Sequence, residues 1–371
     1  MDRTPKGVGR QMALKLRNFL SSFLFPSLFI SFMLAVDCQA KVVRLFAWQS
    51  ADRQITLIMP KVRQESRKQT INRFKKNLVS ATHYRSLLSE FKNDPSQLFA
   101  PFVNGTIRSL IQTNPSFTET IRFAVVANRP AHLNPKGTNY SAIVQSFSKA
   151  GADIYVIPFG IETILTPKEL LAYHQLISKN FPALLATGGA DLDPALYSQR
   201  NTHSDRPNFM MDKVETRLIK RYTEKSPGVF YGICRGHQSY VIATGGTLFQ
   251  DLSLLRPNLV KIHAAKQDAE GNSKSSWHDI TLVDTKNALF EAVGKRTFLV
   301  NSRHHQSVKS IAEGRVIALE SEKVIEGIEK RDSKGRVRVL TVQFHPEDMN
   351  TLDSERIIHW MVQNAQKVLG R

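Results

Sequence analysis

Short apolar runs alternate with helical stretches from Ile121 onward, and this alternation constrains the fold more than any other feature of the chain. The first four runs are IRFAVVA, ADIYVIP, PALLATGG and GVFYGIC. They are too apolar for strands with one face in water, so they predict strands that are buried on both faces. The spacing between them predicts helices at residues 141–149, 167–179 and 212–223. Strand–helix–strand units of this kind predict a mainly parallel sheet with helices on both faces.

Four more strand-like runs and a closing helix follow. The runs are DITLVD, RTFLVNS, RVIALES and VRVLTVQF, and residues 352–369 have helical spacing. The segment from residue 120 to residue 371 holds about 250 residues, which is a usual size for one domain. We therefore expect a single α/β domain over residues 120–371.

The first forty residues have the features of a targeting segment. Basic residues precede an apolar run at residues 19–36, and the small residues Cys38 and Ala40 suit a signal peptidase. Residues 1–40 are therefore predicted to be a signal peptide, with export to a periplasm, a secretory lumen or the exterior. The run is also long enough for an uncleaved membrane anchor, although Pro26 and four serines favour removal.

Residues 41–119 form a basic extension between the signal peptide and the α/β domain. Lysine and arginine outnumber acidic residues strongly at residues 61–76. The apolar positions that suggest one or two short amphipathic helices are Ile71, Phe74, Leu78, Leu87, Leu88 and Phe91. The sequence thus predicts a solvated helical extension, with contact to an anionic membrane surface as one further role.

The charge and the cysteine count restrict the partners and the chemistry. The chain has a formal net charge of +19, but no RNA- or DNA-binding motif accompanies it, so nucleic acid is not an expected partner. Of the two cysteines, Cys38 would leave with the signal peptide. Cys234 would then be unpaired, which makes it either a reactive thiol or a buried inert one. The sequence makes no prediction about oligomeric state.

The segment VFYGICRGHQ at residues 229–238 decides between these two interpretations of Cys234. It places the cysteine at the end of an apolar strand and at the start of the next helix. Neighbours two positions away crowd the backbone in a sharp strand-to-helix turn, so Gly232 and Gly236 suit that geometry. The positive end of the helix dipole also favours a thiolate. Cys234 is therefore a candidate nucleophile.

The segment TVQFHPE supplies a base and a carboxylate. Pro346 disfavours helix at His345, and in extended chain two residues apart point to the same side, so Glu347 can reach the imidazole. A carboxylate on one ring nitrogen leaves the other nitrogen free to accept a thiol proton. Together with Cys234, these residues predict a catalytic triad at the carboxyl end of the sheet.

Five segments, in this order and with this approximate spacing, resemble those of the class I glutamine amidotransferase superfamily. They are TGGADLDPALY, GICRGHQ, GGTLFQDL, NSRHHQSV and QFHPE. They are most similar to its γ-glutamyl hydrolase branch of cysteine peptidases, which includes folate γ-glutamyl hydrolases and γ-glutamyl-γ-aminobutyrate hydrolases. The resemblance covers residues 121 to about 369. It implies a class I glutamine amidotransferase-like fold and no cofactor.

The resemblance also implies roles for individual residues. Cys234 would be the nucleophile, His345 the general base and acid, and Glu347 the carboxylate that orients the imidazole. The backbone N–H groups of Gly189 and Arg235 would form the oxyanion hole. Four further residues would contact the substrate: Gln238, Ser302, His304 and His305.

Two adjacent histidines also raise the question of a metal. Neighbours on a strand point to opposite faces, and no cysteine or carboxylate cluster in the sequence completes a site around His304 and His305. At most one of the pair is therefore expected to face the substrate, and no metal site is predicted.

The resemblance implies an exported hydrolase that cleaves γ-glutamyl amides of small substrates through a γ-glutamyl thioester. Two alternatives remain: a glutaminase component of an amidotransferase, and a non-catalytic envelope-binding protein on the same fold.

Overall fold

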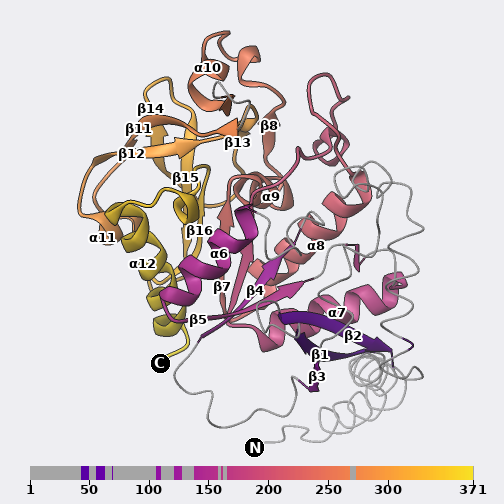
Figure 1. Ribbon diagram of the computed structural model, residues 1–371. Helices are drawn as coiled ribbons and strands as arrows, with labels where there is room; N and C mark the ends of the chain where they lie inside the picture. Colours follow the sequence, from indigo (N-terminus) through magenta and orange to yellow (C-terminus); the bar gives the residue numbers. More distant parts are fainter. Residues whose placement is uncertain are drawn as a thin grey trace, which may run out of the picture.

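The computed structural model describes most of the chain beyond residue 120 and four short parts before it. The described residues are 43–49, 56–62, 69, 106–109, 121–127, 138–157, 160–161, 165–267 and 273–370. Within them, twelve strands form one sheet in the spatial order β12-β11-β14-β15-β16-β7-β6-β4-β5-β2-β1-β3 (Figure 1). The predicted signal peptide, residues 1–40, lies outside the described residues.

Six neighbouring strands at the centre of the sheet run parallel. In spatial order they are β16 (Val337–Val342), β7 (Val229–Ile233), β6 (Ala183–Ala186), β4 (Ile121–Val126), β5 (Ala152–Ile157) and β2 (Thr56–Val62). Almost every residue of β4, β5, β6 and β7 is buried, as expected for strands that helices cover on both faces. The four apolar runs that predicted the parallel sheet are these strands.

Antiparallel strands extend the sheet beyond β16. They are β15 (Ile325–Arg331), β14 (Arg315–Glu320), β11 (Ser276–Leu282) and β12 (Thr297–Ser302). Burial alternates strictly along β11, which shows that one of its faces lies toward solvent. The sheet is therefore mixed, with a parallel centre.

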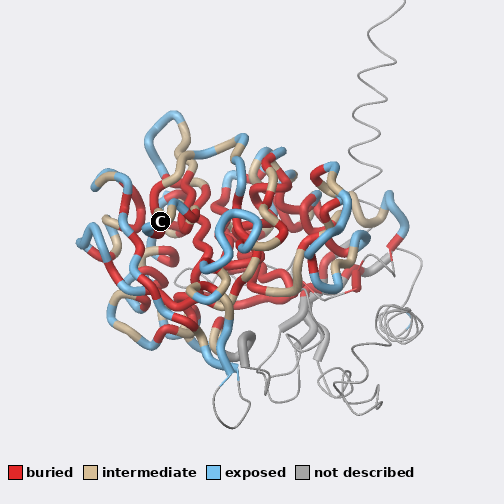
Figure 2. The backbone as a smooth tube through the Cα atoms, turned by 90° about the horizontal axis from the view of Figure 1, so that it is seen from above, coloured by how far each residue is buried: buried red, intermediate tan, exposed pale blue. Residues whose placement is uncertain are grey.

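Helices cover both faces of the parallel centre (Figure 1). On one face α12 (Leu352–Val368) packs against β4, β7 and β16, with α6 (Thr138–Lys149) beside it. On the other face α7 (Pro167–Asn180) packs against α8 (Phe209–Lys225), which contacts β7. The backbone of the central strands is buried, and exposed segments lie around it (Figure 2). The predicted α/β class is confirmed.

Local sequence signals fix where these helices begin. At α7, Thr166 and Glu169 form a reciprocal capping box, and Pro167 occupies the first turn, where its missing N–H has no cost. Thr351 caps α12 in the same reciprocal way with Ser354. No helix within the described ranges is both long and apolar enough to cross a membrane.

Three strands make up the described part of the basic extension, apart from the single helical residue Gln69. They are β1 (Val43–Gln49), β2 and β3 (Thr106–Ser109). Leu45 and Ile58 are buried, and the Tyr173 hydroxyl of α7 donates to Ile58 O at 2.7 Å. The runs VRLFAWQ and TLIMPKV are rich in β-branched and aromatic residues, which favour strands. The apolar positions that suggested helices, residues 71–91, lie outside the described residues.

Strand β15 was not predicted from the sequence because its run IEGIEKR is too highly charged. Glu326 and Glu329 are nevertheless fully buried. Glu329 is paired with Arg315 and Arg331, whose guanidinium groups compensate its buried charge. Glu326 has no such cation and lies instead among histidines.

Candidate active site

Cys234 lies in the turn between β7 and α9 (Arg235–Ala243). Its backbone has φ 52° and ψ −104°, a positive φ that is strained for any residue with a side chain. A Cβ on Gly232 would lie 2.6 Å from Gly236 O, and a Cβ on Gly236 would lie 2.1 Å from Ala186 O. Neither position accepts a side chain without a shift of the backbone. The two glycines therefore permit the turn that holds Cys234 at its apex.

A histidine and a glutamate lie beside this turn, at the end of the neighbouring parallel strand β16. His345 Nδ1 lies 2.8 Å from Glu347 Oε1, and the imidazole also hydrogen-bonds the Cys234 side chain. The backbone N–H of His345 donates to Asn301 Oδ1 at 2.9 Å. The structure thus brings together the thiol of Cys234, the imidazole of His345 and the carboxylate of Glu347, the three groups proposed from the sequence.

The electrostatics of His345 favour its protonated form. Burial disfavours a charged imidazole, but the negative charges of Glu347 and Cys234, with hydrogen bonds to both, outweigh burial and raise the pKa of His345 to about 9. An imidazolium next to a sulfur stabilises the thiolate, which is the nucleophilic form. Cys234 remains 7% exposed, so the sulfur is enclosed but not sealed.

Gly188 is a part of this centre that sequence reasoning missed. A Cβ at this position would lie 2.7 Å from His345 Cε1 and 3.7 Å from Cys234 Cβ. The neighbouring Thr187 accepts a hydrogen bond from Gly236 N–H at 3.1 Å, which ties the end of β6 to the cysteine turn. The glycine pair after β6 was a visible signal, but only its second member was assigned a role. Gly188 gives the imidazole room to approach the sulfur.

The two N–H groups predicted for the oxyanion hole belong to Gly189 and Arg235. Among the hydrogen bonds of the described residues, neither N–H donates one, so both are available to a substrate oxygen. The Arg235 side chain is buried and pairs with Asp212 at 2.6 Å and Glu215 at 2.5 Å, both on α8. These ion pairs hold the start of α9 in place, which leaves only the backbone of Arg235 for the substrate.

Gln238 and Ser302 are engaged within the protein. Gln238 Nε2 donates to Gln306 O and to Gln343 Oε1, both at 3.1 Å, and Ser302 Oγ donates to His263 O at 2.6 Å. Both side chains are almost fully buried. They support the structure around the centre, and their contact with a substrate stays a prediction.

His304 and His305 diverge, as the sequence indicated. His305 is partly exposed and lies between Asp191 Oδ2 at 2.8 Å and Asp251 Oδ2 at 2.9 Å. The hydrogen bond to Asp191, supported by Asp251 and opposed by burial, raises the pKa of His305 to about 9. His304 is buried, and its Nδ1–H donates to Gln306 O at 2.8 Å. Its Nε2, on the other side of the ring, faces a group of buried side chains that includes two further histidines.

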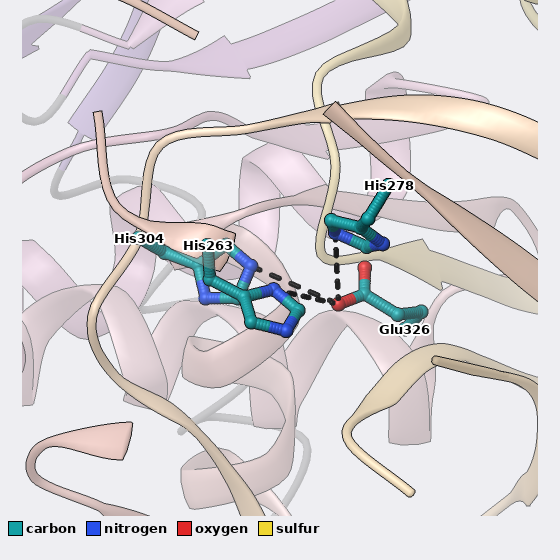
Figure 3. Close-up of side chains that lie close together, drawn as sticks. All are labelled: His263, His278, His304 and Glu326. Carbon is teal, nitrogen blue, oxygen red and sulfur yellow. Dashed lines mark ion pairs between the residues drawn. The ribbon is translucent and has the colours of Figure 1, made fainter. Parts of the chain in front are cut away.

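That group is the histidine–glutamate cluster, made of His263, His278, His304 and Glu326 (Figure 3). One ligand-type atom from each residue lies within 4.8 Å of the others, and all four residues are buried. The sequence argument found no carboxylate to accompany His304, and the structure supplies Glu326 from β15. The four residues come from α10 (Leu259–His263), β11, the loop after β12, and β15, so no local spacing could have revealed the cluster.

Two solved structures are similar to this chain at low sequence identity. One is the glutaminase domain of Trypanosoma brucei CTPS with bound acivicin, at 15% identity and a TM-score of 0.47, covering 67% of this chain and 94% of that one. The other is a glutamine amidotransferase from Thermotoga maritima, at 13% identity and a TM-score of 0.39, covering 67% of this chain and 94% of that one.

Curated relatives are more similar in sequence. A protein from Mycobacterium tuberculosis named "Putative glutamine amidotransferase" is 35% identical over 192 residues, which is 51% of this chain and 57% of that protein. The NtpR protein of Enterococcus hirae is 32% identical over 186 residues, 50% of this chain and 72% of that protein. Each match thus covers about half of this chain.

The fold and the cysteine-centred site define a hydrolase of the glutamine amidotransferase-like class. The family model of Peptidase C26 matches residues 124–347, well over half of the chain. The chain therefore belongs to the Peptidase C26 family.

Proposed function

We propose that the protein is a cysteine hydrolase that cleaves γ-glutamyl amide bonds and releases glutamate and an amine. The observation that carries this proposal is the geometry of the centre: Cys234 at a strained turn, hydrogen-bonded to His345, which is held by Glu347 at 2.8 Å. A strained backbone maintained next to an ion-paired imidazole is typical of a nucleophile and serves no evident purpose in a core.

The proposed reaction has two steps. The Cys234 thiolate attacks the γ-carbonyl carbon, and the oxyanion accepts hydrogen bonds from the N–H groups of Gly189 and Arg235. The C–N bond breaks as His345 protonates the departing amine, which leaves a γ-glutamyl thioester. His345 then takes a proton from water, and the resulting attack on the thioester releases glutamate and restores the thiolate. Glu347 fixes the imidazole orientation in both steps.

The choice of the γ-glutamyl amide as substrate has chemical support from the relatives. Glutamine is itself a γ-glutamyl amide, so a glutamine amidotransferase and a γ-glutamyl hydrolase attack the same bond and differ in the amine and in its fate. The relative from M. tuberculosis carries the amidotransferase name. A small γ-glutamyl compound is thus the substrate class that suits both the family and the centre.

A panel of γ-linked substrates tests the proposal. We expect purified protein to hydrolyse γ-glutamyl-p-nitroanilide or at least one γ-glutamyl peptide or amine, and we expect Cys234→Ala to lose that hydrolysis. Activity on glutamine alone, and only with an ammonia-accepting partner, would favour an amidotransferase component instead. Wild-type protein that turns over no member of the panel would favour a non-catalytic binding protein.

We also propose that the protein is exported and that residues 1–40 are removed. The support is the order of basic, apolar and small residues in that segment. Mass spectrometry of the mature amino terminus tests this: a start at Lys41 supports export with cleavage, and an intact apolar run would favour the membrane anchor. Contact of the basic extension with an anionic surface is a separate proposal, which sedimentation with anionic vesicles can measure.

A further inference from the structure

We propose that the histidine–glutamate cluster is a binding site for one divalent transition-metal ion, and that zinc is the ion it suits best. Three imidazoles and one carboxylate converge in it, a donor set that zinc accepts readily (Figure 3). The proposal is independent of the hydrolase function, because the thiolate chemistry of Cys234 requires no metal.

The first argument is that six polar atoms of the cluster make no hydrogen bond. His304 Nε2, His278 Nε2, both ring nitrogens of His263 and both carboxylate oxygens of Glu326 are buried and make no hydrogen bond. All four residues are more than nine-tenths buried. Buried polar groups in folded proteins almost always have a partner, and six such atoms in one cluster are costly without one. A bound cation would satisfy four of them directly.

The second argument is the spacing of these atoms. Glu326 Oε1 lies 3.6 Å from His263 Nδ1 and 3.8 Å from the Nε2 atoms of His278 and His304. These distances are too long for hydrogen bonds, which place such atoms about 2.7–3.2 Å apart. Ligands about 2.0–2.1 Å from a tetrahedral zinc ion are separated by roughly 3.3 Å. The three spacings from Glu326 Oε1 are slightly wider than those of a zinc tetrahedron, and all four ligand atoms lie within 4.8 Å of one another, so an ion would draw the ligands inward.

The third argument is that two histidines are already held in the tautomer that a metal requires. His304 Nδ1–H donates to the carbonyl of Gln306 at 2.8 Å, and His278 Nδ1 lies 3.3 Å from the carbonyl of Asp279. A carbonyl can only accept, so each Nδ1 carries the proton and each Nε2 lone pair is free. Outer hydrogen bonds of this kind accompany most metal-binding histidines.

The charge balance is consistent with these contacts. Neutral imidazole is the form that coordinates a metal, and a dication would also stabilise the Glu326 carboxylate. The cluster has no cationic side chain to do so.

The position of the cluster points to a structural role beside the active centre. Its four protein ligands leave a tetrahedral ion without an open position, as in closed zinc sites. His263 O accepts from both Ser302 Oγ and His304 N–H, and Asn301, next to Ser302 on β12, accepts from the N–H of His345. An ion would therefore join α10, β11, β15 and the loop after β12 into one rigid wall next to the nucleophile.

Metal analysis of the full-length protein tests the site. We expect protein produced with zinc in the medium to contain about one zinc per chain after dialysis. Removal with a chelator should lower the melting temperature, and Zn²⁺ in hundredfold excess over its dissociation constant should restore it by roughly 5–10 °C, whereas Mg²⁺ should not. Co²⁺ in place of zinc should show the visible absorption of a tetrahedral ion.

Variants separate the cluster from other zinc-binding groups. His278→Ala and Glu326→Gln should each lower the zinc content at least tenfold, whereas His359→Ala, on the exposed side of α12, should retain it. Cys234→Ala should also retain zinc, which excludes the catalytic thiol as the ligand. If a ligand variant does not fold, the Co²⁺ spectrum and the chelator-dependent melting of the wild type decide instead.

Three results would overturn the proposal. They are wild-type protein free of metal that gains no stability from Zn²⁺ or Co²⁺, zinc that stays bound in the His278→Ala and Glu326→Gln variants, and zinc that is lost with Cys234→Ala. The first two results would not bear on γ-glutamyl hydrolysis, whereas the third would place zinc on the proposed nucleophile.

Discussion

The cysteine turn and the histidine–glutamate cluster are neighbours, yet the chain builds them in opposite ways. The catalytic groups come from two short segments, residues 229–238 and 343–347, at the ends of the adjacent parallel strands β7 and β16. Cluster residues come from four separate elements and meet only when the antiparallel part of the sheet is complete. Backbone strain and close glycines define the first region, whereas unpaired polar atoms define the second. Local motifs can thus specify a nucleophile, but a buried ligand set depends on the whole fold.

The variant that separates the two regions most clearly is Cys234→Ala, which removes the catalytic sulfur. Cys234→Ala should lower kcat/KM by about 10³-fold or more, because the nucleophile and the triad act as one unit. Its melting temperature should stay close to that of the wild type, since alanine fits where cysteine did. Residual activity of Cys234→Ala within tenfold of wild type would assign the chemistry elsewhere.

The carboxylate of the triad gives the next largest effect. Glu347→Gln should lower kcat/KM by about 10²-fold, because the amide lacks the negative charge that orients His345 and favours its protonated form. The wild type should lose activity as pH rises through about 9, where His345 loses the proton that it gives to the leaving amine. An opposite charge raises this pKa, so the variant should lose activity at a lower pH than the wild type does.

The neighbouring carboxylate is the control for this pH profile. Asp348 pairs with Arg303 and not with the imidazole of His345. Asp348→Asn should therefore lose activity at the same alkaline pH as the wild type. If the wild type and Glu347→Gln, measured across the same pH range, lose activity at the same alkaline pH, the role of Glu347 is contradicted.

The close packing of the cysteine turn predicts a stability effect. Gly236→Ala should lower the free energy of unfolding by roughly 2–3 kcal/mol, because its Cβ would meet Ala186 O at 2.1 Å and the backbone must move. Gly335→Ala is the comparison: it has open space around it, and its φ of 74° costs only about 1 kcal/mol. Urea unfolding measures both variants. The packing argument fails if Gly236→Ala is the milder of the two.

The smallest effect is expected at His305, which is partly exposed. Asp191 and Asp251 raise the pKa of His305 from its ordinary value of 6.5 to about 9. A raised pKa adds stability that is complete below pH 6.5 and disappears as pH rises through 9. His305→Gln should therefore cost roughly 1 kcal/mol in mildly acidic solution and almost nothing above pH 9, given its partial exposure. A cost that does not depend on pH would point to packing instead.

The same contrast explains how much the sequence could predict. The parallel strands and their helices were predicted because apolar runs and helical periodicity are local properties. The triad was predicted because Gly232 and Gly236 permit a sharp turn at Cys234, and Pro346 restricts the backbone at His345. Strand β15 was missed because its run is highly charged, and the sequence does not show that Glu329 is buried against Arg331 and against Arg315 of the neighbouring strand β14. Glu326 could not be matched with His304 for a similar reason, since only the three-dimensional sheet brings them within 3.8 Å.

The most direct test of the central claim is the mass of the acylated enzyme. Wild-type protein mixed with a γ-glutamyl substrate and quenched rapidly in acid should gain the mass of one γ-glutamyl group, on the peptide that contains Cys234. His345→Ala should accumulate less of this thioester, and Cys234→Ala should accumulate none. Turnover of the substrate without any adduct on Cys234, or with the adduct on another residue, would contradict the account.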